Sequence, residues 1–349
     1  MSSIKDVARF VGCSTSTISR VLNNRDAVDP KTRQKVLDAV DKLGYKPNLV
    51  AQGLRVRKGN LIGLVVPNTL THSFNFLIYR IMEYARQQGY SVIFADTQNN
   101  PDNEEAFIDD LLRRHVNGII FSRVSDESRI MPKLLKKNVP FVVIDRALEK
   151  EKVPTVVLNN AQAGRLAATH LVELGHRKIA CITGPLKIGL CRERLKGFQD
   201  VLKENGIHLG KEWVFEGDFV FRSGIEAIEN FIQKGCDFSA IWVLNDVMAF
   251  GVLKELQRRD IRVPADVSLI GMDNMDFDEM LTPALTSIHY PFDEMAEKAV
   301  ELIIKQSKGE DIENEMIILT PSLVIRESTS RYRDMADHKY SLSMSKDER

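Results

Sequence analysis

The chain has 349 residues, of which 44% are hydrophobic and 28% charged, and 48 lysines and arginines balance 48 aspartates and glutamates. This composition is typical of a globular protein of two or three domains. No apolar stretch reaches the ~18 residues that span a bilayer, and the first residues lack the apolar core of a secretory signal. We therefore expect a cytoplasmic protein.

The net charge of zero hides a strong asymmetry along the chain. Residues 1–60 carry 12 lysines and arginines against five aspartates, a net charge of +7, and the rest of the chain carries −7. Such an asymmetry indicates an anion-seeking module joined to an acidic globular body.

Residues 1–46 are predicted to form three short helices. Ser3 with Asp6 has the pattern of a capping box, Ser14 can cap a second helix, and Asp29-Pro30 begins a third helix that ends at Gly44. The apolar stripes predicted to face the core are Val7, Ala8, Val11, Ile18, Val21, Leu22, Val36, Leu37, Val40 and Leu43.

Residues 47–60 follow as a short basic linker. Pro47-Asn48 can start a helix and Gly59 can end it, but a helix of this length is marginal in water, and Gly53 costs it about 1 kcal/mol more. We expect this segment to be helical only when something else holds it.

From residue 61 onward, short apolar runs alternate with amphipathic stretches. The predicted strands are Leu61–Pro67, Ser91–Ala95, Gly118–Phe121, Phe141–Ile144, Lys178–Thr183, Ala240–Leu244 and Val267–Gly271. The predicted helices include Phe74–Gln88, Asn103–His115, Ala161–Leu174 and Asp246–Arg259. This alternation predicts an α/β fold with parallel sheets.

About 270 residues exceed what one open sheet usually organises, so we expect the body, residues 61–330, to have two lobes. The first lobe is predicted to contain about 61–160 plus 291–318, and the second about 161–290 plus 319–330, with a junction near Val157–Gly164. Residues 331–349 are predicted to be a flexible polar tail.

The first two predicted helices are separated by a tight turn that contains Gly12, which matches a helix-turn-helix. The second helix presents hydroxyls and a guanidinium, and Arg20 is a candidate for bidentate contact with guanine. A small helical bundle with a solvated charged face is the alternative. The candidate DNA-binding residues here are Thr15, Ser16, Thr17, Arg20 and Asn23.

Several spaced motifs make the chain resemble the LacI/GalR family of bacterial transcriptional regulators over roughly residues 3–329. The motifs are Ile4–Ala8, Gly12–Asn23, Gly44–Asn48, Ala51–Leu54, Gly175–Ile179, Gly184-Pro185, Arg194–Phe198, Asn245–Gly251, Val263–Gly271 and Thr282–Thr286. The resemblance implies a helix-turn-helix domain and a hinge helix, followed by a two-lobed body like the periplasmic binding proteins.

The resemblance also implies how the linker meets DNA. Leu54 matches the leucine that the family inserts into the minor groove at the operator centre, with Arg55 beside it. Two hinge helices are needed, which implies a homodimer on a palindromic operator. Gln52 stands where many relatives carry arginine, which puts one phosphate contact in doubt.

The body contains no recognisable catalytic or metal motif. It has no phosphate-binding glycine loop and no nucleophile elbow, and the histidines and four cysteines of the whole chain lack metal-ligand spacing. We expect no enzyme activity and no cofactor. Polar residues follow three predicted strands at their carboxyl ends, where α/β sheets bind ligands. These pairs are Asp145-Arg146, Asn245-Asp246 and Asp273-Asn274.

By resemblance, an effector lies between the two lobes of the body. The positions that match the family's effector-binding residues or face its cleft are His72, Phe74, Asp145, Arg194, Phe221, Asn245 and Asp273. Positive charge from His72, Arg146, Arg192 and Arg194 favours an anionic sugar derivative, such as a sugar acid or phosphate, over a neutral sugar.

We therefore expect a repressor of carbohydrate-metabolism genes that is controlled by a small sugar-type effector. The sequence leaves open whether the effector induces or corepresses, and a phosphocarrier protein is a further possible partner. A transporter's solute-binding component and an α/β enzyme with a DNA-binding module are the rival classes. The lack of an export signal argues against the first, and the lack of a phosphate loop against the second.

Overall fold

The computed structural model describes residues 2–22, 28–45, 60–124, 130–137, 139–146, 153–310, 312 and 315–333. It divides into two units, Met1–Gly59 and Asn60–Arg349. Within the described ranges, no helix is both long and apolar enough to cross a membrane.

The N-terminal unit contains three helices, α1 (Ile4–Val11), α2 (Thr15–Leu22) and α3 (Pro30–Lys42). The predicted caps are confirmed. Ser3 and Asp6 form a complete capping box on α1, the Asp29 side chain caps α3 in front of Pro30, and Gly44 has a positive φ of 57° after α3. Helices α1 and α3 therefore begin where a side chain accepts a hydrogen bond from a backbone N–H that has no partner within the helix.

The small core of this unit contains Val7, Ala8, Ile18, Val21, Val36 and Ala39. The prediction that Leu37 faces this core is wrong, because 41% of its surface is exposed. Val36 and Ala39 lie three residues apart on one face of α3, and Leu37 lies about 100° around the helix from Val36.

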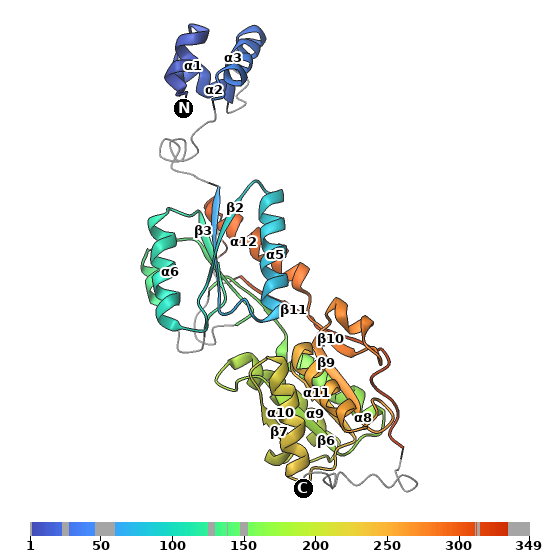
Figure 1. Cartoon of the computed structure of the whole chain (residues 1–349). Helices are drawn as coiled ribbons and strands as arrows, with labels where there is room; N and C mark the ends of the chain where they lie inside the picture. Colours follow the sequence, from blue (N-terminus) through green and yellow to red (C-terminus); the bar gives the residue numbers. More distant parts are fainter. Residues whose placement is uncertain are drawn as a thin grey trace, which may run out of the picture. The chain divides into compact units, whose positions relative to one another are not determined.

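The first sheet of the larger unit has strand order β11-β5-β4-β3-β1-β2, and all of its neighbouring strands are parallel. Its strands are β1 (Leu61–Val66), β2 (Ser91–Asp96), β3 (Gly118–Phe121), β4 (Phe141–Ile144), β5 (Thr155–Leu158) and β11 (Met316–Leu319). The helices of this lobe are α5 (His72–Gln87), α6 (Pro101–Arg113), α7 (Ile130–Lys137) and α12 (Phe292–Ser307). Helices α5 and α12 cover one face, and α6 covers the other (Figure 1).

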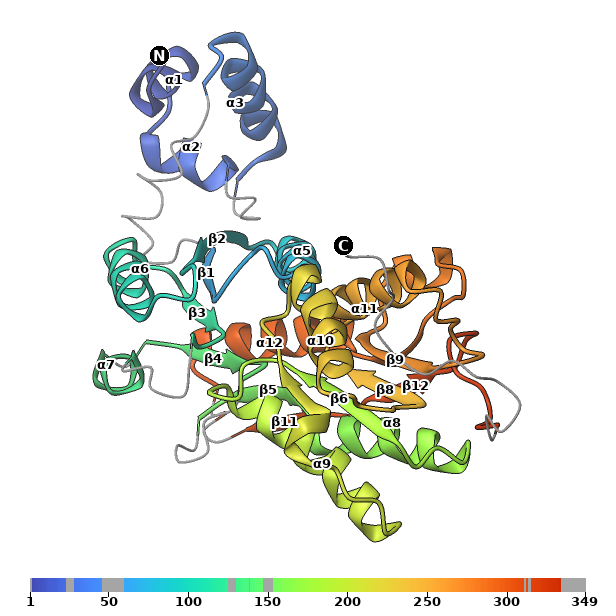
Figure 2. The same cartoon turned by 60° about the horizontal axis from the view of Figure 1, so that its bottom comes forward.

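The second sheet has strand order β12-β10-β9-β8-β6-β7, with only the β10–β12 pair antiparallel. Its strands are β6 (Ile179–Thr183), β7 (Val214–Glu216), β8 (Ala240–Val243), β9 (Ser268–Asp273), β10 (Thr286–His289) and β12 (Ser322–Val324). Helices α8 (Asn160–Glu173) and α9 (Gly189–Glu204) pack together, as do α10 (Phe221–Gln233) and α11 (Asp246–Arg258), on opposite faces (Figure 2). Two short 3-10 helices, η1 (Lys211–Trp213) and η2 (Asp276–Met280), complete this lobe.

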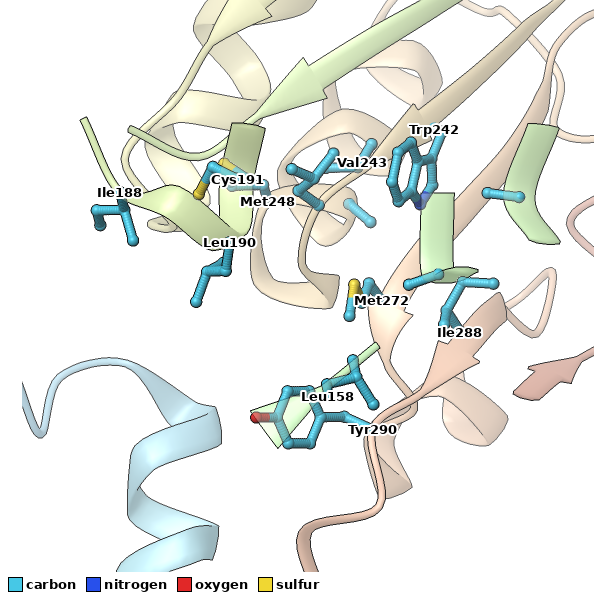
Figure 3. Packing of buried hydrophobic residues seen from close by; sticks show 14 of the residues in the cluster. Leu158, Ile188, Leu190, Cys191, Trp242, Val243, Met248, Met272, Ile288 and Tyr290 are labelled. Carbon is cyan, nitrogen blue, oxygen red and sulfur yellow. The ribbon is translucent and has the colours of Figure 1, made fainter. Parts of the chain in front are cut away.

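The chain passes between the two sheets three times, from β5 to α8, from β10 to α12 and from β11 to β12. We call the part around the first sheet lobe 1 and the part around the second sheet lobe 2. Buried apolar side chains from both lobes form one continuous cluster, part of which is drawn in Figure 3. All three crossing segments leave from the carboxyl ends of strands, namely β5, β10 and β11.

Candidate functional site

The first candidate site is helix α2 of the N-terminal unit. Ser14 begins this helix, because its hydroxyl accepts a hydrogen bond from the backbone N–H of Thr17 at 3.1 Å. Ile18 and Val21 are buried against the other two helices. The hydrophobic side of α2 is thus fixed in the bundle, and the other side is left for contact with a partner.

The outward side of α2 carries the residues predicted to contact DNA. Arg20 and Ser16 are exposed, and Thr15 and Thr17 are partly buried. Three further predicted DNA-binding residues, Asn23, Leu54 and Arg55, lie outside the described residues. A helix that is anchored on one side and presents hydroxyls and a guanidinium on the other has the form of a recognition helix for the major groove.

The second candidate site is a cleft between the lobes, with about 500 Å³ of empty space including its open mouth. Lobe 1 and lobe 2 both contribute to its wall. The lining residues are Thr71, Ser73, Phe74, Leu77, Asp145, Arg146, Leu190, Arg194, Phe219, Leu244, Asn245, Asp273, Tyr290 and Phe292.

Arg194 in α9 is the central cation of the lobe 2 wall. It is 4% exposed, and its Nε donates to Asn160 Oδ1 at 2.9 Å. Its Nη1 also approaches the backbone oxygen of Leu244 at 3.4 Å. The bond to Asn160 fixes the direction of the guanidinium, which leaves the group preorganised for an acceptor in the cleft.

Asn245, which follows β8, caps a helix and also lines the cleft. Its Oδ1 caps α11 by accepting the backbone N–H of Met248 at 2.9 Å, and its Nδ2 donates to the backbone oxygen of Phe219 at 3.0 Å. The cap fixes the side chain at the start of a helix. An amide held in this way can orient a ligand without a large loss of side-chain entropy.

Two arginines and two aspartates line the cleft. Arg146 donates through Nη1 to the backbone oxygen of Arg123 at 2.7 Å, and its Nε lies 3.7 Å from Asp145 Oδ2. Across the cleft, burial and the charge of Asp246 raise the pKa of Asp273 well above its usual value, although Arg194 opposes the shift.

The comparisons with known proteins agree on both parts of the chain. Residues 3–48 match the family described as bacterial regulatory proteins, lacI family, and residues 168–329 match a periplasmic binding protein-like domain. The HTH-type transcriptional repressor PurR of Photobacterium profundum is 34% identical over 329 residues, which cover 94% of this chain and 98% of that protein. This chain belongs to the lacI family. It is a DNA-binding transcriptional repressor and not an enzyme.

Other lacI-family proteins extend the comparison. PurR of Mannheimia succiniciproducens is 34% identical over 333 residues, covering 95% of this chain and 99% of that protein. The lac repressor dimer bound to operator and the anti-inducer ONPF has a TM-score of 0.88 and 30% identity, covering 94% of this chain and 99% of that one. A CelR–cellobiose complex has a TM-score of 0.73 and 28% identity, covering 94% and 100%. The expected family and fold class are confirmed, and both rival classes are excluded.

The cleft of this lacI-family chain brings together five of the seven predicted effector-binding residues, Phe74, Asp145, Arg194, Asn245 and Asp273. His72 and Phe221 do not line it. The His72 ring lies edge-on to Phe277 with centroids 5.9 Å apart, and Phe221 begins α10 with 43% of its surface exposed.

Phe219, two residues before Phe221, lines the cleft. Its backbone has a φ of 71°, which turns the chain just before α10. A Cβ added at Gly184 would lie 2.1 Å from the Phe219 ring, so the ring occupies space that this glycine leaves open. The Gly184-Pro185 pair in the sequence was the available signal.

Sequence reasoning also missed Tyr290 and Phe292. Both lie where the chain passes from β10 in lobe 2 to α12 in lobe 1, and both line the cleft. Their rings stack with centroids 4.4 Å apart and an interplanar angle of 17°. Neither follows a strand that had been predicted, so the rule of polar residues at strand ends did not reach them.

Proposed function

We propose that this repressor binds a small sugar-type effector in the cleft between its lobes, and that the bound effector changes its affinity for a palindromic operator. The observation that carries the proposal is the cleft itself, where fixed donors and acceptors face aromatic side chains. Arg194 and Asn245 come from lobe 2, whereas Phe74 and Asp145 come from lobe 1. A ligand held by both lobes favours one angle between them over others.

The mixture of hydrogen-bond donors and acceptors in the cleft favours a neutral sugar over an anionic one. Of the four basic residues that favoured an anion, Arg146 and Arg194 line the cleft, together with the carboxyl groups of Asp145 and Asp273. Arg192 is exposed and donates to the backbone oxygen of Leu186 at 2.8 Å. Sugar hydroxyls both donate and accept hydrogen bonds, which suits this mixture of donors and acceptors.

Two solved relatives support the sugar class. CelR was solved as a complex with cellobiose, and a regulator of the lacI family from Escherichia coli described as sugar-binding was solved with phosphate. The second of these is 29% identical to this chain, with a TM-score of 0.70 over 79% of it. We extend the class of ligand, not its identity, to this chain.

For DNA binding, we propose that α2 enters the major groove and that Arg20 contacts a base edge. The hydroxyls of Thr15, Ser16 and Thr17 then contact bases or phosphates. We also propose that 1–46 is the DNA-binding domain and that residues 47–60, with Leu54 and Arg55, form the hinge that reaches the minor groove. An Arg20→Ala variant should lose discrimination between operator and random DNA. Equal losses on both DNAs would contradict base readout by Arg20.

A homodimer is the second part of the proposal. Helix α5 exposes three large apolar side chains that lie three residues apart, Phe76 at 38%, Tyr79 at 60% and Met82 at 43%. They form a stripe along one side of the helix, and such a stripe marks a surface for association. Because an operator palindrome calls for a two-fold protein, we assign the stripe to a second copy of this chain.

Selection of DNA by the purified protein, with and without candidate sugars, tests the proposed function. The protein should enrich a palindrome, and a neutral sugar that it binds by calorimetry should change the enrichment in one direction. That direction distinguishes induction from corepression. Binding of sugar acids or phosphates alone would overturn the neutral class. Regulation of carbohydrate-metabolism genes and a phosphocarrier partner stay predictions, which the selected sites and a pull-down with that carrier would test.

A further inference from the structure

Tyr290 lies where the chain passes from β10 in lobe 2 to α12 in lobe 1, and its backbone N–H donates to the Asp273 oxygen of lobe 2 at 3.4 Å. Its side chain is 3% exposed and packs on lobe 1, where its hydroxyl donates to Asp145 Oδ1 at 2.8 Å and Met295 Sδ lies 3.3 Å from the hydroxyl oxygen. Asp145 follows β4, in lobe 1. Burial and the negative charge of Asp145 raise the pKa of Tyr290 well above its usual value, so the phenol keeps its proton and acts as the donor.

Asp145 is held on both of its oxygens while it faces the cleft. Tyr290 binds Oδ1, and Arg146 Nε lies 3.7 Å from Oδ2. The Asp145 backbone has a φ of 64°, a left-handed conformation that few non-glycine residues adopt, and its N–H donates to the Val156 oxygen at 3.0 Å. A conformation of this kind persists only where its surroundings fix it.

The Tyr290 ring is held independently of its hydroxyl. The ring stacks on Phe292, which in turn meets the edge of the Phe76 ring at 5.7 Å between centroids. Figure 3 shows the hydroxyl oxygen of Tyr290 directed away from Trp242 and Ile288 of lobe 2. A Tyr290→Phe substitution therefore removes the hydroxyl and leaves the stacked ring in place.

We propose that Tyr290 is a positioning residue for effector recognition, which holds Asp145 of lobe 1 in the orientation that accepts a hydrogen bond from the effector. The acceptor is thus presented to a ligand hydroxyl or N–H in the cleft. This inference rests on the proposed function of the cleft.

Hydrogen exchange of the full chain without sugar tests the positioning step. Tyr290→Phe should accelerate exchange in residues 141–146 by about tenfold, the loss expected for a hydrogen bond to a charged group. The double variant with Asp145→Ala should exchange there no faster than the faster single variant. Tyr84→Phe, on α5 where its ring lies under Arg80, is the matched control and should match the wild type. Exchange in Tyr290→Phe at the wild-type rate would overturn the proposal.

Calorimetry with D-glucose, D-ribose and cellobiose tests the consequence for recognition. For a sugar that the wild type binds, Tyr290→Phe should weaken binding about tenfold, with no further loss in the Asp145→Ala background. A merely structural role predicts equal losses in both backgrounds, which would contradict the proposal. If the wild type binds none of the three sugars, these members of the sugar class are wrong for the cleft, and the exchange result still decides whether Tyr290 positions Asp145.

Discussion

Asp278 in η2 offers a sharp test of the electrostatics behind the cleft, through the substitution Asp278→Asn. Its side chain is fully buried, and its Oδ2 lies 3.8 Å from Arg326 Nη1. Asp246, also fully buried, already accepts hydrogen bonds from Ser287 Oγ at 2.8 Å and from the backbone N–H of Met275 at 3.2 Å. Burial, followed by the charge of Asp246, raises the pKa of Asp278 to about 9.

The magnitude follows from proton linkage. An unfolded aspartate has a pKa of about 3.9, so between about pH 4 and pH 9 the folded state holds a proton on Asp278 that the unfolded state has lost. The free energy of unfolding then falls by about 1.4 kcal/mol for each unit that the pH rises. From pH 5 to pH 8 this one group removes about 4 kcal/mol.

Asparagine cannot titrate, and its amide can donate to Asp246 in place of the carboxyl proton. The stability of Asp278→Asn relative to the wild type should therefore rise by about 4 kcal/mol between pH 5 and pH 8. Urea unfolding at several pH values, followed by the fluorescence of Trp242 in the core of the same lobe, measures this difference. Asp276→Asn, exposed on the same turn, is the matched control. A difference that stays constant with pH would refute the protonated state of Asp278.

Two further predictions concern the stability of lobe 2. Gly164→Ala should destabilise the chain by about 3 kcal/mol or more, because its Cβ would lie 2.0 Å from the backbone oxygen of Arg194 where α8 and α9 pack together. Thermal unfolding measures this loss. A variant as stable as the wild type would contradict the close packing of the two helices. Burial lowers the pKa of His170 and His176, so the contribution of these two groups to stability should fall as the pH drops below about 6.5. Urea unfolding should show that His176→Gln gains stability relative to the wild type between pH 7.5 and pH 5.5, and a difference that is the same at both pH values would exclude His176 as a source.

The sequence predicted those parts of the fold that depend on near neighbours. Ser3 and Asp29 cap helices with groups three residues away, so the ends of α1 and α3 could be predicted. Strands β3 and β4 were predicted with the bounds that they have, because each is a short run of four buried apolar residues. Strand β10 was missed, since Thr286 and Ser287 are buried through partners more than 40 residues away in sequence.

The residues of the cleft that could be predicted are likewise those with a local signal in the sequence. Asp145, Asn245 and Asp273 end strands, so the rule for α/β sheets pointed to them. Phe219 and Tyr290 enter the cleft from connecting segments. The position of the Phe219 ring depends on the space left by Gly184, and that of Tyr290 depends on the segment that joins β10 to α12. No local pattern in the sequence encodes those long-range contacts.

The coupling between the cleft and the operator can be measured directly on the full chain. The affinity of the full chain for a selected palindrome is measured by fluorescence anisotropy, with and without a saturating sugar that calorimetry shows to bind. We predict a change of about 5- to 150-fold in the wild type, the usual range of allosteric coupling, and no change in an Asp273→Ala variant at the same sugar concentration. An operator affinity that is the same with and without the bound sugar would contradict the coupling between the cleft and the operator.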